Sequence, residues 1–431
     1  MTVTKDKVFR TRPPAMGISG SAIKPTGWYT DYKDPPRFMT IKHLRTLFTE
    51  ISHHSSVSDI VIKSNEPVTL KTKGHGVQAI THRCIYDDEV HVFARELSND
   101  VGVMQRVSQG ETVSGQGNVL SNEGIAEDKS IKNRYRFEIV GCSAKSTERG
   151  VSIIMRPLPE APMKYSDLKI PLEFVENCIV KDGIVIVAGA TGEGKSTTLG
   201  SVIRYVLEND TDIKGIILTH EDPIEVSFET IRSEHSVVMQ SAIGQGEHVL
   251  SFVRANRSAM RRSPDLVLLG ELRDEDTIEA AVELSLTGHP VFATTHASNI
   301  SSIFPRLISR FPQELQSQKA FDLIDTTRFL VAQKLIWTTE GKLMAVRETL
   351  VFTDGLRDYL KKCSNNTELL YGTINKIMRE ELLGAQSYLG QGNRLLEAGI
   401  IDEKNYRLLT GYSSVQEQVE DDINYEEMLA I

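Results

Sequence analysis

The chain has 431 residues, of which 40% are hydrophobic and 25% are charged, and its formal net charge is −9. This length exceeds what one hydrophobic core usually supports, so we expect two domains with extensions. The net acidity argues against a protein whose main role is to hold nucleic acid, because phosphate backbones are bound by clustered positive charge. The four cysteines form no C-x-x-C pair, which indicates free thiols in a reducing compartment.

The N-terminus carries three basic residues, but no apolar run follows them, so no secretory signal peptide is predicted. No stretch is apolar and long enough to span a bilayer, and a transmembrane segment is not expected. We therefore expect a cytoplasmic protein that reaches a membrane only by docking to partners.

Composition and hydrophobic patterning divide the chain into five segments. The predicted segments are an extended N-terminal arm at 1–40, a first domain at 41–156, a proline-rich interdomain linker at 157–171, a second domain at 172–354 and a helical extension with an acidic tail at 355–431. Each boundary is placed where the periodic pattern starts, stops or changes its period.

The first domain shows alternating runs and one helical pattern. The strands predicted there are Ser58–Ile62, Val68–Lys71, Tyr135–Val140 and Val151–Met155, and the helix is His91–Leu97. Leu44, Leu47 and Phe48 also have helical spacing. These elements predict a mixed α+β domain.

The second domain alternates short apolar runs with helical patterns. The predicted strands are Ile184–Val187, Gly215–Thr219, Leu266–Leu269 and Val291–Thr294, and the predicted helices include Lys195–Leu207 and Thr277–Leu286. Continuous apolar runs of this length are typical of strands buried on both faces. The pattern predicts a doubly wound α/β domain, followed by helices that include Glu368–Leu383.

A phosphate-binding loop follows the first of these strands. Its sequence, Gly189-Ala190-Thr191-Gly192-Glu193-Gly194-Lys195-Ser196-Thr197, fits G-x-x-x-x-G-K-[ST] and lies between a β-branched strand and a helix. Glycines let the backbone N–H groups turn toward phosphate oxygens, and the helix N-terminus favours negative charge. We expect these nine residues to bind ATP, with Lys195 on the β- and γ-phosphates and the Ser196 hydroxyl on Mg²⁺.

Carboxylates follow two other predicted strands. Glu271 is expected at the C-terminal edge of the sheet beside the loop, where it could polarise water or contact the metal. Asp265 opens the same strand and is expected at the opposite edge as a turn residue. Glu221, Asp222 and Glu225 form an acidic cluster that suits a Mg²⁺-nucleotide site, with a solvated acidic turn as the alternative.

Four segments in fixed order carry a resemblance to a known family. They are GATGEGKSTT (Gly189–Thr198), LTHEDPIE (Leu218–Glu225), RSAMRRSPDLVLLGELRD (Arg257–Asp274) and TGHPVFATTHAS (Thr287–Ser298). Together they resemble the Walker A, Asp, Walker B and His boxes of the secretion ATPase superfamily, which includes type IV pilus retraction motors and type II secretion ATPases. SDIVIKSNEPV and NRYRFEI upstream resemble strands of the family's PAS-like domain.

The resemblance implies a RecA-like P-loop domain, an α+β PAS-like N-terminal domain and a mostly helical C-terminal extension. It also implies a homo-oligomer, typically a hexameric ring, that holds ATP and Mg²⁺ between the N-domain of one subunit and the C-domain of its neighbour. Membrane-associated secretion proteins are the implied partners, at the inner face of the bacterial inner membrane, and no direct nucleic-acid binding is expected.

Family roles carry over to matching positions of this sequence. Glu271 becomes the catalytic glutamate, Glu221 an acidic-box residue and a metal ligand together with Ser196, and His296 the His-box residue. From composition alone, a lone histidine such as His296 at a strand end would be assigned a structural role. His289 is a second candidate for the histidine role. Arginines on the N-domain strands are implied to contact the transferred phosphate: Arg136, Arg149 and Arg156, with Arg134 close by.

Several features depart from the retraction motors. Ser263-Pro264-Asp265 replaces Asp-Pro-Asp, His220 replaces an aliphatic residue, and the His box has Thr-Thr-His. The retraction motors' Ala-Ile-Arg-Asn-Leu-Ile segment is not found. These departures, with the arm and the extension, are more similar to the DotB/TraJ-like ATPases of type IVB secretion and plasmid conjugation.

Four functions stay open on this sequence. The first is a hexameric ATPase that powers a type IVB secretion or conjugation apparatus, and the second is a type IV pilus motor. A DNA-handling module is motivated by the arginines of one predicted helix, Arg254, Arg257, Arg261 and Arg262. A nucleotide-gated scaffold that barely hydrolyses ATP is disfavoured by the intact Lys195, Ser196 and Glu271.

Overall fold

The computed structural model describes residues 37–38, 43, 46–48, 51, 57–72, 76–120, 132–144, 147–159, 161–244 and 247–412. Most of the predicted N-terminal arm and the predicted acidic tail lie outside these residues. The chain divides into two compact units, Met1–Glu160 and Ala161–Ile431. None of the helices within the described ranges has the length and apolar character that crossing a bilayer requires.

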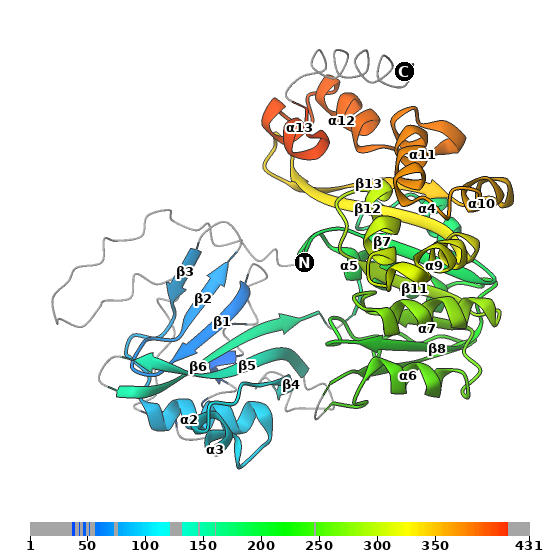
Figure 1. The fold of residues 1–431 in the computed structure, drawn as a ribbon. Coiled ribbons are helices and arrows are strands. Elements are labelled where there is room, and N and C mark those ends of the chain that lie inside the picture. Colours follow the sequence, from blue (N-terminus) through cyan, green and yellow to red (C-terminus); the bar gives the residue numbers. More distant parts are fainter. Residues whose placement is uncertain are drawn as a thin grey trace. The chain divides into compact units, whose positions relative to one another are not determined.

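Within the described residues, the first unit contains a six-stranded antiparallel sheet with helices packed on it (Figure 1). Its elements are β1 (Val57–Lys63), β2 (Thr69–Thr72), β3 (Gly76–Ala79), α2 (Asp87–Ser98), α3 (Val103–Ser108), β4 (Val113–Leu120), β5 (Lys132–Ala144) and β6 (Thr147–Leu158). The strand order is β3-β2-β1-β6-β5-β4. Helices α2 and α3 contact β4, β5 and β6, so they cover one face of this part of the sheet.

The start of α2 is fixed by a buried carboxylate. Glu89 accepts hydrogen bonds from the backbone N–H of Tyr86 (2.8 Å) and of Phe38 (2.6 Å), and forms an ion pair with Arg83. The capping box starts the helix at Asp87, four residues before the predicted start at His91. Phe38, at the end of the predicted arm, is fully buried in the core of this unit.

The second unit contains a seven-stranded sheet in the order β13-β12-β7-β11-β10-β8-β9. The strands are β7 (Gly183–Ala188), β8 (Gly215–Glu221), β9 (Ser236–Ala242), β10 (Leu266–Leu269), β11 (Pro290–Thr295), β12 (Thr327–Trp337) and β13 (Leu343–Val351). All neighbours pair in parallel except β12 and β13, which are antiparallel. The four strands predicted in this region are confirmed, whereas β9, β12 and β13 were not predicted.

Helices cover both faces of this sheet (Figure 1). They are α4 (Leu172–Cys178), α5 (Lys195–Glu208), α6 (Phe252–Ala259), α7 (Glu275–Leu286), α8 (Ile303–Ile308) and α9 (Gln313–Thr326). Successive residues of β7 face opposite sides: Ile184 and Ile186 pack in one core cluster, and Val185 and Val187 pack in another with α4 and α5. The predicted doubly wound α/β arrangement is therefore confirmed.

Helices after β13 extend the larger of these two clusters. They are α10 (Asp354–Lys361), α11 (Thr367–Arg379), α12 (Tyr388–Glu397) and α13 (Glu403–Thr410), and two short 3₁₀ turns lie at Ile300–Ser302 and Leu382–Gly384. The predicted helix Glu368–Leu383 was too long, because the chain turns at Glu381 and Leu383 into left-handed backbone. The Glu381 carboxylate accepts the Ser387 backbone N–H at 2.9 Å just before α12.

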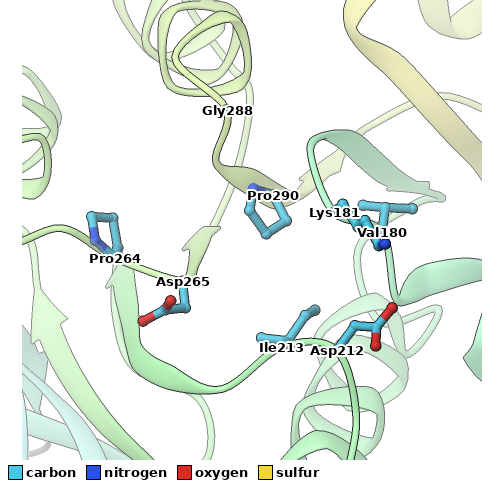
Figure 2. Close-up of a pocket in the computed structure, with 8 residues that line it drawn as sticks. All are labelled: Val180, Lys181, Asp212, Ile213, Pro264, Asp265, Gly288 and Pro290. Carbon is cyan, nitrogen blue, oxygen red and sulfur yellow. The ribbon is translucent and has the colours of Figure 1, made fainter.

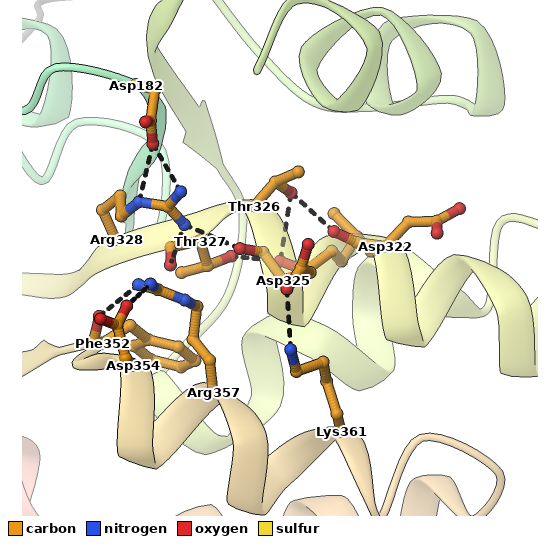
Figure 3. A network of polar contacts seen from close by, with 11 residues as sticks. Asp182, Asp322, Asp325, Thr326, Thr327, Arg328, Phe352, Asp354, Arg357 and Lys361 are labelled. Atoms are coloured by element: carbon orange, nitrogen blue, oxygen red, sulfur yellow. Dashed lines mark hydrogen bonds and ion pairs between the residues drawn. The ribbon is translucent and has the colours of Figure 1, made fainter. Parts of the chain in front are cut away.

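One ion pair attaches the first of these helices to α9, and another joins β12 to the segment before β7 (Figure 3). Lys361 of α10 pairs with Asp325 of α9 at 2.9 Å. Arg328 of β12 donates from Nε to Asp182, which precedes β7, at 3.0 Å. The helices beyond β13 are thus part of the same packed unit as the parallel sheet.

The buried Tyr406 provides a test of this packing. Tyr406 is fully buried in α13 and its hydroxyl donates to Asn393 Oδ1 at 2.8 Å. We expect Tyr406→Ala to lower the free energy of unfolding of this unit by about 3 to 5 kcal/mol, as truncation of a buried aromatic side chain does. Leu408→Ala removes a side chain of the same helix that is 64% exposed, and is expected to change it by less than about 0.5 kcal/mol. Urea denaturation measures both, and equal effects would contradict the packing.

Candidate functional site

The phosphate-binding loop joins β7 to α5 as predicted. Gly192 and Gly194 have φ angles of +87° and +78°, a region that side chains with a Cβ atom rarely adopt. Ala190, Thr191 and Thr197 are exposed and Ser196 is half-buried, so this loop presents its backbone and hydroxyl groups to solvent at the N-terminus of a 14-residue helix. This is the geometry that binds anionic phosphates.

Lys195 points back over the loop from the first turn of α5. Its ammonium donates to the carbonyl oxygens of Gly189 (2.8 Å) and Ala190 (3.1 Å), and lies 3.4 Å from His296 Nδ1. Burial lowers the pKa of Lys195, and the carboxylates of Glu271 and Glu225 oppose that shift. The loop thus holds a cation where the β- and γ-phosphates of a nucleotide would lie.

His296 lies between Lys195 and Glu271. It follows β11, which separates β7 from β10 in the sheet, and its Nε2 lies 3.4 Å from Glu271 Oε1. An ammonium can only donate, so His296 Nδ1 accepts from Lys195 and Nε2 carries the proton that faces Glu271. The structure therefore brings the predicted lysine, histidine and glutamate together in one line, with His296 rather than Glu271 next to the lysine.

Glu221 lies at the next position along the same edge, at the end of β8. The strand register pairs Leu269 with His220, so Glu221 lies beside Gly270, where an added Cβ atom would be 3.2 Å from Glu221 Cα. Its carboxylate accepts from Thr219 Oγ1 (2.7 Å) and from Gln240 Nε2 (3.2 Å). Burial raises the pKa of Glu221, although these hydrogen bonds oppose the shift.

The other acids of the predicted cluster are not buried, although the charge of Glu225 acts on both Lys195 and Glu221. Asp222 and Glu225 are exposed, and Asp222 pairs with Arg273 at 3.1 Å. No group of three or more Asp, Glu, His or Cys side chains converges to hold a metal within the described ranges. Ser196 and Glu221 offer a hydroxyl and a carboxylate oxygen, the ligand type that Mg²⁺ prefers, and bound phosphates and water commonly supply the rest of its coordination sphere.

Two threonines of β11 form hydrogen bonds across the C-terminal edge of the sheet, and this role was not predicted. Thr294 Oγ1 donates to the Gly270 carbonyl, and Thr295 Oγ1 donates to the Leu272 carbonyl at 3.3 Å. These bonds attach the segment that carries Glu271 to the strand that carries His296. The sequence feature that could have indicated this role is the pair of consecutive threonines at the end of an apolar strand.

His220 replaces an aliphatic residue with a buried polar contact. Its Nδ1 lies 3.0 Å from Asn256 Oδ1, and its Nε2 lies 3.1 Å from a terminal nitrogen of Arg262. The guanidinium can only donate, so Nε2 accepts and Nδ1 carries the proton. Burial lowers the pKa of His220 to about 4; the Asn256 bond opposes this shift and the Arg262 charge adds to it.

The candidate arginines lie on the strands of the first unit. Arg136 of β5 is exposed directly opposite Arg156 of β6, and Arg156 pairs with Asp59 at 2.9 Å. Arg134 donates to Gln116 at 3.3 Å, and Arg149 is exposed near the far end of β6. Arg156 already has a carboxylate partner in Asp59, so Arg136 is the better candidate of the two for a further anion.

A cavity of about 370 Å³ lies at the opposite edge of the parallel sheet (Figure 2). Its lining includes Lys181, Asp212, Asp265 and Pro290, each of which precedes or begins a strand. Asp265 accepts the Ile216 backbone N–H at 2.7 Å, which confirms its prediction as a turn residue at the far end of β10. His289 also lies at this end, before β11, and is thus separated from His296 by the length of that strand.

Comparison with known proteins places this geometry among secretion ATPases. The family described as "Type II/IV secretion system protein" matches residues 150–367. A "Twitching motility protein" of Neisseria gonorrhoeae is 33% identical over 54% of this chain and 59% of that protein. The "Type IV pilus retractation ATPase PilT" of Pseudomonas aeruginosa is 31% identical over 65% of this chain and 79% of that protein.

A solved structure matches over most of the chain. The X-ray structure of the Yersinia pseudotuberculosis ATPase DotB is 34% identical, with a TM-score of 0.77, and the match covers 92% of this chain and all of that one. The expected fold class, a RecA-like domain with a β-rich N-terminal domain and a helical C-terminal region, is confirmed.

The buried His220 predicts a pH-dependent stability. Its pKa in the folded chain is about 4 against an ordinary value of 6.5, so between these values the unfolded chain binds a proton that the folded chain does not. The contribution of His220 to the free energy of unfolding is fully present above pH 6.5 and is lost as the pH falls toward 4. Each pKa unit corresponds to about 1.4 kcal/mol, so we expect the free energy of unfolding to be about 2 kcal/mol lower at pH 5.

Urea denaturation of wild type and His220→Leu at pH 7.5 and pH 5 measures this effect. We expect the variant to be less stable at pH 7.5, because Asn256 and Arg262 lose a partner, and to show a smaller loss at pH 5. Equal pH dependence in the two proteins would contradict the assignment.

Proposed function

The chain belongs to the type II/IV secretion system protein family, and we propose that it is an ATPase that hydrolyses ATP at the loop Gly189–Ser196 to drive a type IVB secretion or conjugation apparatus. The resemblance to the secretion ATPase superfamily, and to its DotB-like members, is confirmed by these matches. The observation that carries the proposal is the line Lys195–His296–Glu271 beside the loop.

Each member of this line has a role in hydrolysis. The loop N–H groups and Lys195 bind the phosphates and neutralise the charge that develops on the γ-phosphate oxygens. Glu271 accepts the proton of the attacking water, and the Nε2–H of His296 orients that carboxylate. Because Nδ1 of His296 contacts Lys195, the histidine also links the water-activating group to the phosphate-binding group.

Mg²⁺ is proposed as the required ion. If bound there, it would supply positive charge that neutralises the phosphate oxygens. Ser196 and Glu221 are the residues that would hold it, Ser196 directly at the start of α5 and Glu221 from the end of β8. Burial disfavours the ionised form of Glu221, and a bound cation would favour it.

A ring is proposed because the ATP site needs positive charge for its transition state, and Arg136 and Arg156 are exposed arginines opposite each other on β5 and β6. In a hexamer these arginines, with Arg149, would approach the nucleotide of the neighbouring subunit. The ring would work at the cytoplasmic face of the bacterial inner membrane, attached to the membrane proteins of the apparatus. A pilus motor is the second candidate, favoured by the 31% identity to the PilT ATPase.

Genomic neighbourhood distinguishes the two systems. Secretion-channel genes beside this gene would support the first candidate and pilin genes the second. Co-purification from membranes then tests the docking partner, since a motor of either kind is expected to remain bound to an inner-membrane protein of its own system.

The role of Glu271 predicts a separation of binding from turnover. Glu271→Gln keeps the shape of the side chain but removes the proton acceptor, so we expect the ATP turnover rate to fall about 10²- to 10⁴-fold while ATP affinity is retained. Glu283→Gln, an exposed position on α7, is the control and is expected to leave turnover unchanged. Retained turnover in Glu271→Gln would rule out this role.

The proposed ring predicts complementation between defective subunits. Arg136→Ala is expected to lower turnover by roughly 10³-fold if this arginine stabilises the transferred phosphate. Mixing it in equal amounts with Glu271→Gln should restore about a quarter of wild-type turnover. A site is intact when its glutamate comes from an Arg136→Ala subunit and its arginine from a Glu271→Gln subunit, which holds for about one interface in four.

The control for mixing is Arg106→Ala, whose arginine pairs with Asp100 and Glu111 away from the strands. It is expected to be active alone. A mixture of Arg136→Ala and Glu271→Gln that stays inactive, although both variants assemble, would place the arginine in the same subunit as the site or outside the site.

A further inference from the structure

Strand β12 runs along the side of the phosphate-binding loop that faces away from His296. It pairs with β7 in parallel, with Ala332 opposite Ala188, so its next residues lie beside the loop that begins at Gly189. A Cβ atom on Gly189 would be 2.6 Å from the Gln333 carbonyl oxygen. The backbone N–H of Leu335 donates to the Glu193 carboxylate.

The side chain of Gln333 connects the loop to the helix that follows it. Gln333 is 1% exposed. Its Nε2 donates to the backbone carbonyl of Glu193, and its Oε1 accepts from Thr198 Oγ1 at 2.8 Å. One amide therefore holds the last part of the loop and the first turn of α5 in a common position.

Arg347 determines which way this amide points. Its Nε donates to Gln333 Oε1 at 2.7 Å from the neighbouring strand β13. A guanidinium has no acceptor, so the oxygen of Gln333 must face Arg347 and the amino group must face Glu193. Burial lowers the pKa of Arg347 to about 10, so this arginine stays charged near neutral pH. Its guanidinium lies 5.6 Å from the Phe174 ring, a favourable cation–π contact.

We propose that Gln333 is a positioning residue for the phosphate-binding loop, oriented by Arg347, and that it controls nucleotide affinity rather than the rate of bond cleavage. This inference rests on the proposed function, because it needs nucleotide at the loop. The hydrogen bonds of the side chain are to Glu193, Thr198 and Arg347, so it acts through the loop. A loop that keeps one shape before and during the reaction binds the ground state and the transition state equally well. Loss of that shape therefore changes KM and leaves kcat unchanged.

Binding of ADP to the full chain, measured by calorimetry, tests the role directly. We expect Gln333→Ala to weaken ADP binding about tenfold, as loss of one buried hydrogen-bonding group does. We expect the KM for ATP to rise by a similar factor while kcat changes by less than about threefold. Gln316→Ala removes an amide that caps the Phe311 carbonyl at 3.0 Å on α9, and serves as the matched control with wild-type affinity.

Gln333→Glu separates positioning from structural support. The glutamate has the same shape and can form an ion pair with Arg347, so the variant is expected to fold, which thermal denaturation checks. It cannot donate to the Glu193 carbonyl and places a charged oxygen against it, so ADP affinity should fall at least as far as in Gln333→Ala. If Gln333 had a purely structural role, Gln333→Glu would be a stable protein that binds ADP with wild-type affinity.

Arg347→Met completes the design. Without the guanidinium the amide loses its orientation, so ADP affinity should fall, and Gln333→Ala in the same chain should add little further loss. Additive losses, or Gln333→Glu with ADP affinity within twofold of wild type, would overturn the inference. Wild type that does not bind ADP would overturn the proposed function, and the inference with it.

Discussion

The parallel pairing of β7, β11, β10 and β8 is the constraint on which the site depends. Parallel strands end at one edge of the sheet, so the residues that follow them are neighbours although they are far apart in sequence. The phosphate-binding loop follows β7, His296 follows β11, Glu271 follows β10 and Glu221 completes β8. The order of the strands therefore decides which functional groups touch, and the lysine contacts the histidine because β11 lies next to β7.

Burial then determines the chemistry of these groups. Lys195, Glu221 and His220 all lie in low-dielectric surroundings, and burial acts on each pKa in the direction that disfavours charge. Hydrogen bonds offset part of this cost: Thr219 and Gln240 donate to Glu221, and His220 donates to Asn256. The site is thus a set of polar groups held by a dense apolar sheet, which suits binding of a highly charged nucleotide.

Local sequence patterns were sufficient for the central strands and for the loop. Ile184–Val187 and Leu266–Leu269 are continuous apolar runs, and burial on both sheet faces explains them. β9 is an edge strand whose side chains alternate between half-buried and exposed, so its seven residues lack such a run. The end of α11 was misplaced because the break at Glu381 depends on a contact with Ser387, which no local pattern reveals.

The sequence by itself determined the nucleotide loop, the acids that follow two strands and the family of the chain, because these depend on residue types at short spacing. Only the tertiary structure decided that His296 stands between Lys195 and Glu271, that Glu221 turns inward while Asp222 and Glu225 stay exposed, and that Gln333 supports the loop. The physical reason is that such contacts depend on strand order and register, which are settled by packing of the whole sheet rather than by the residues near each site.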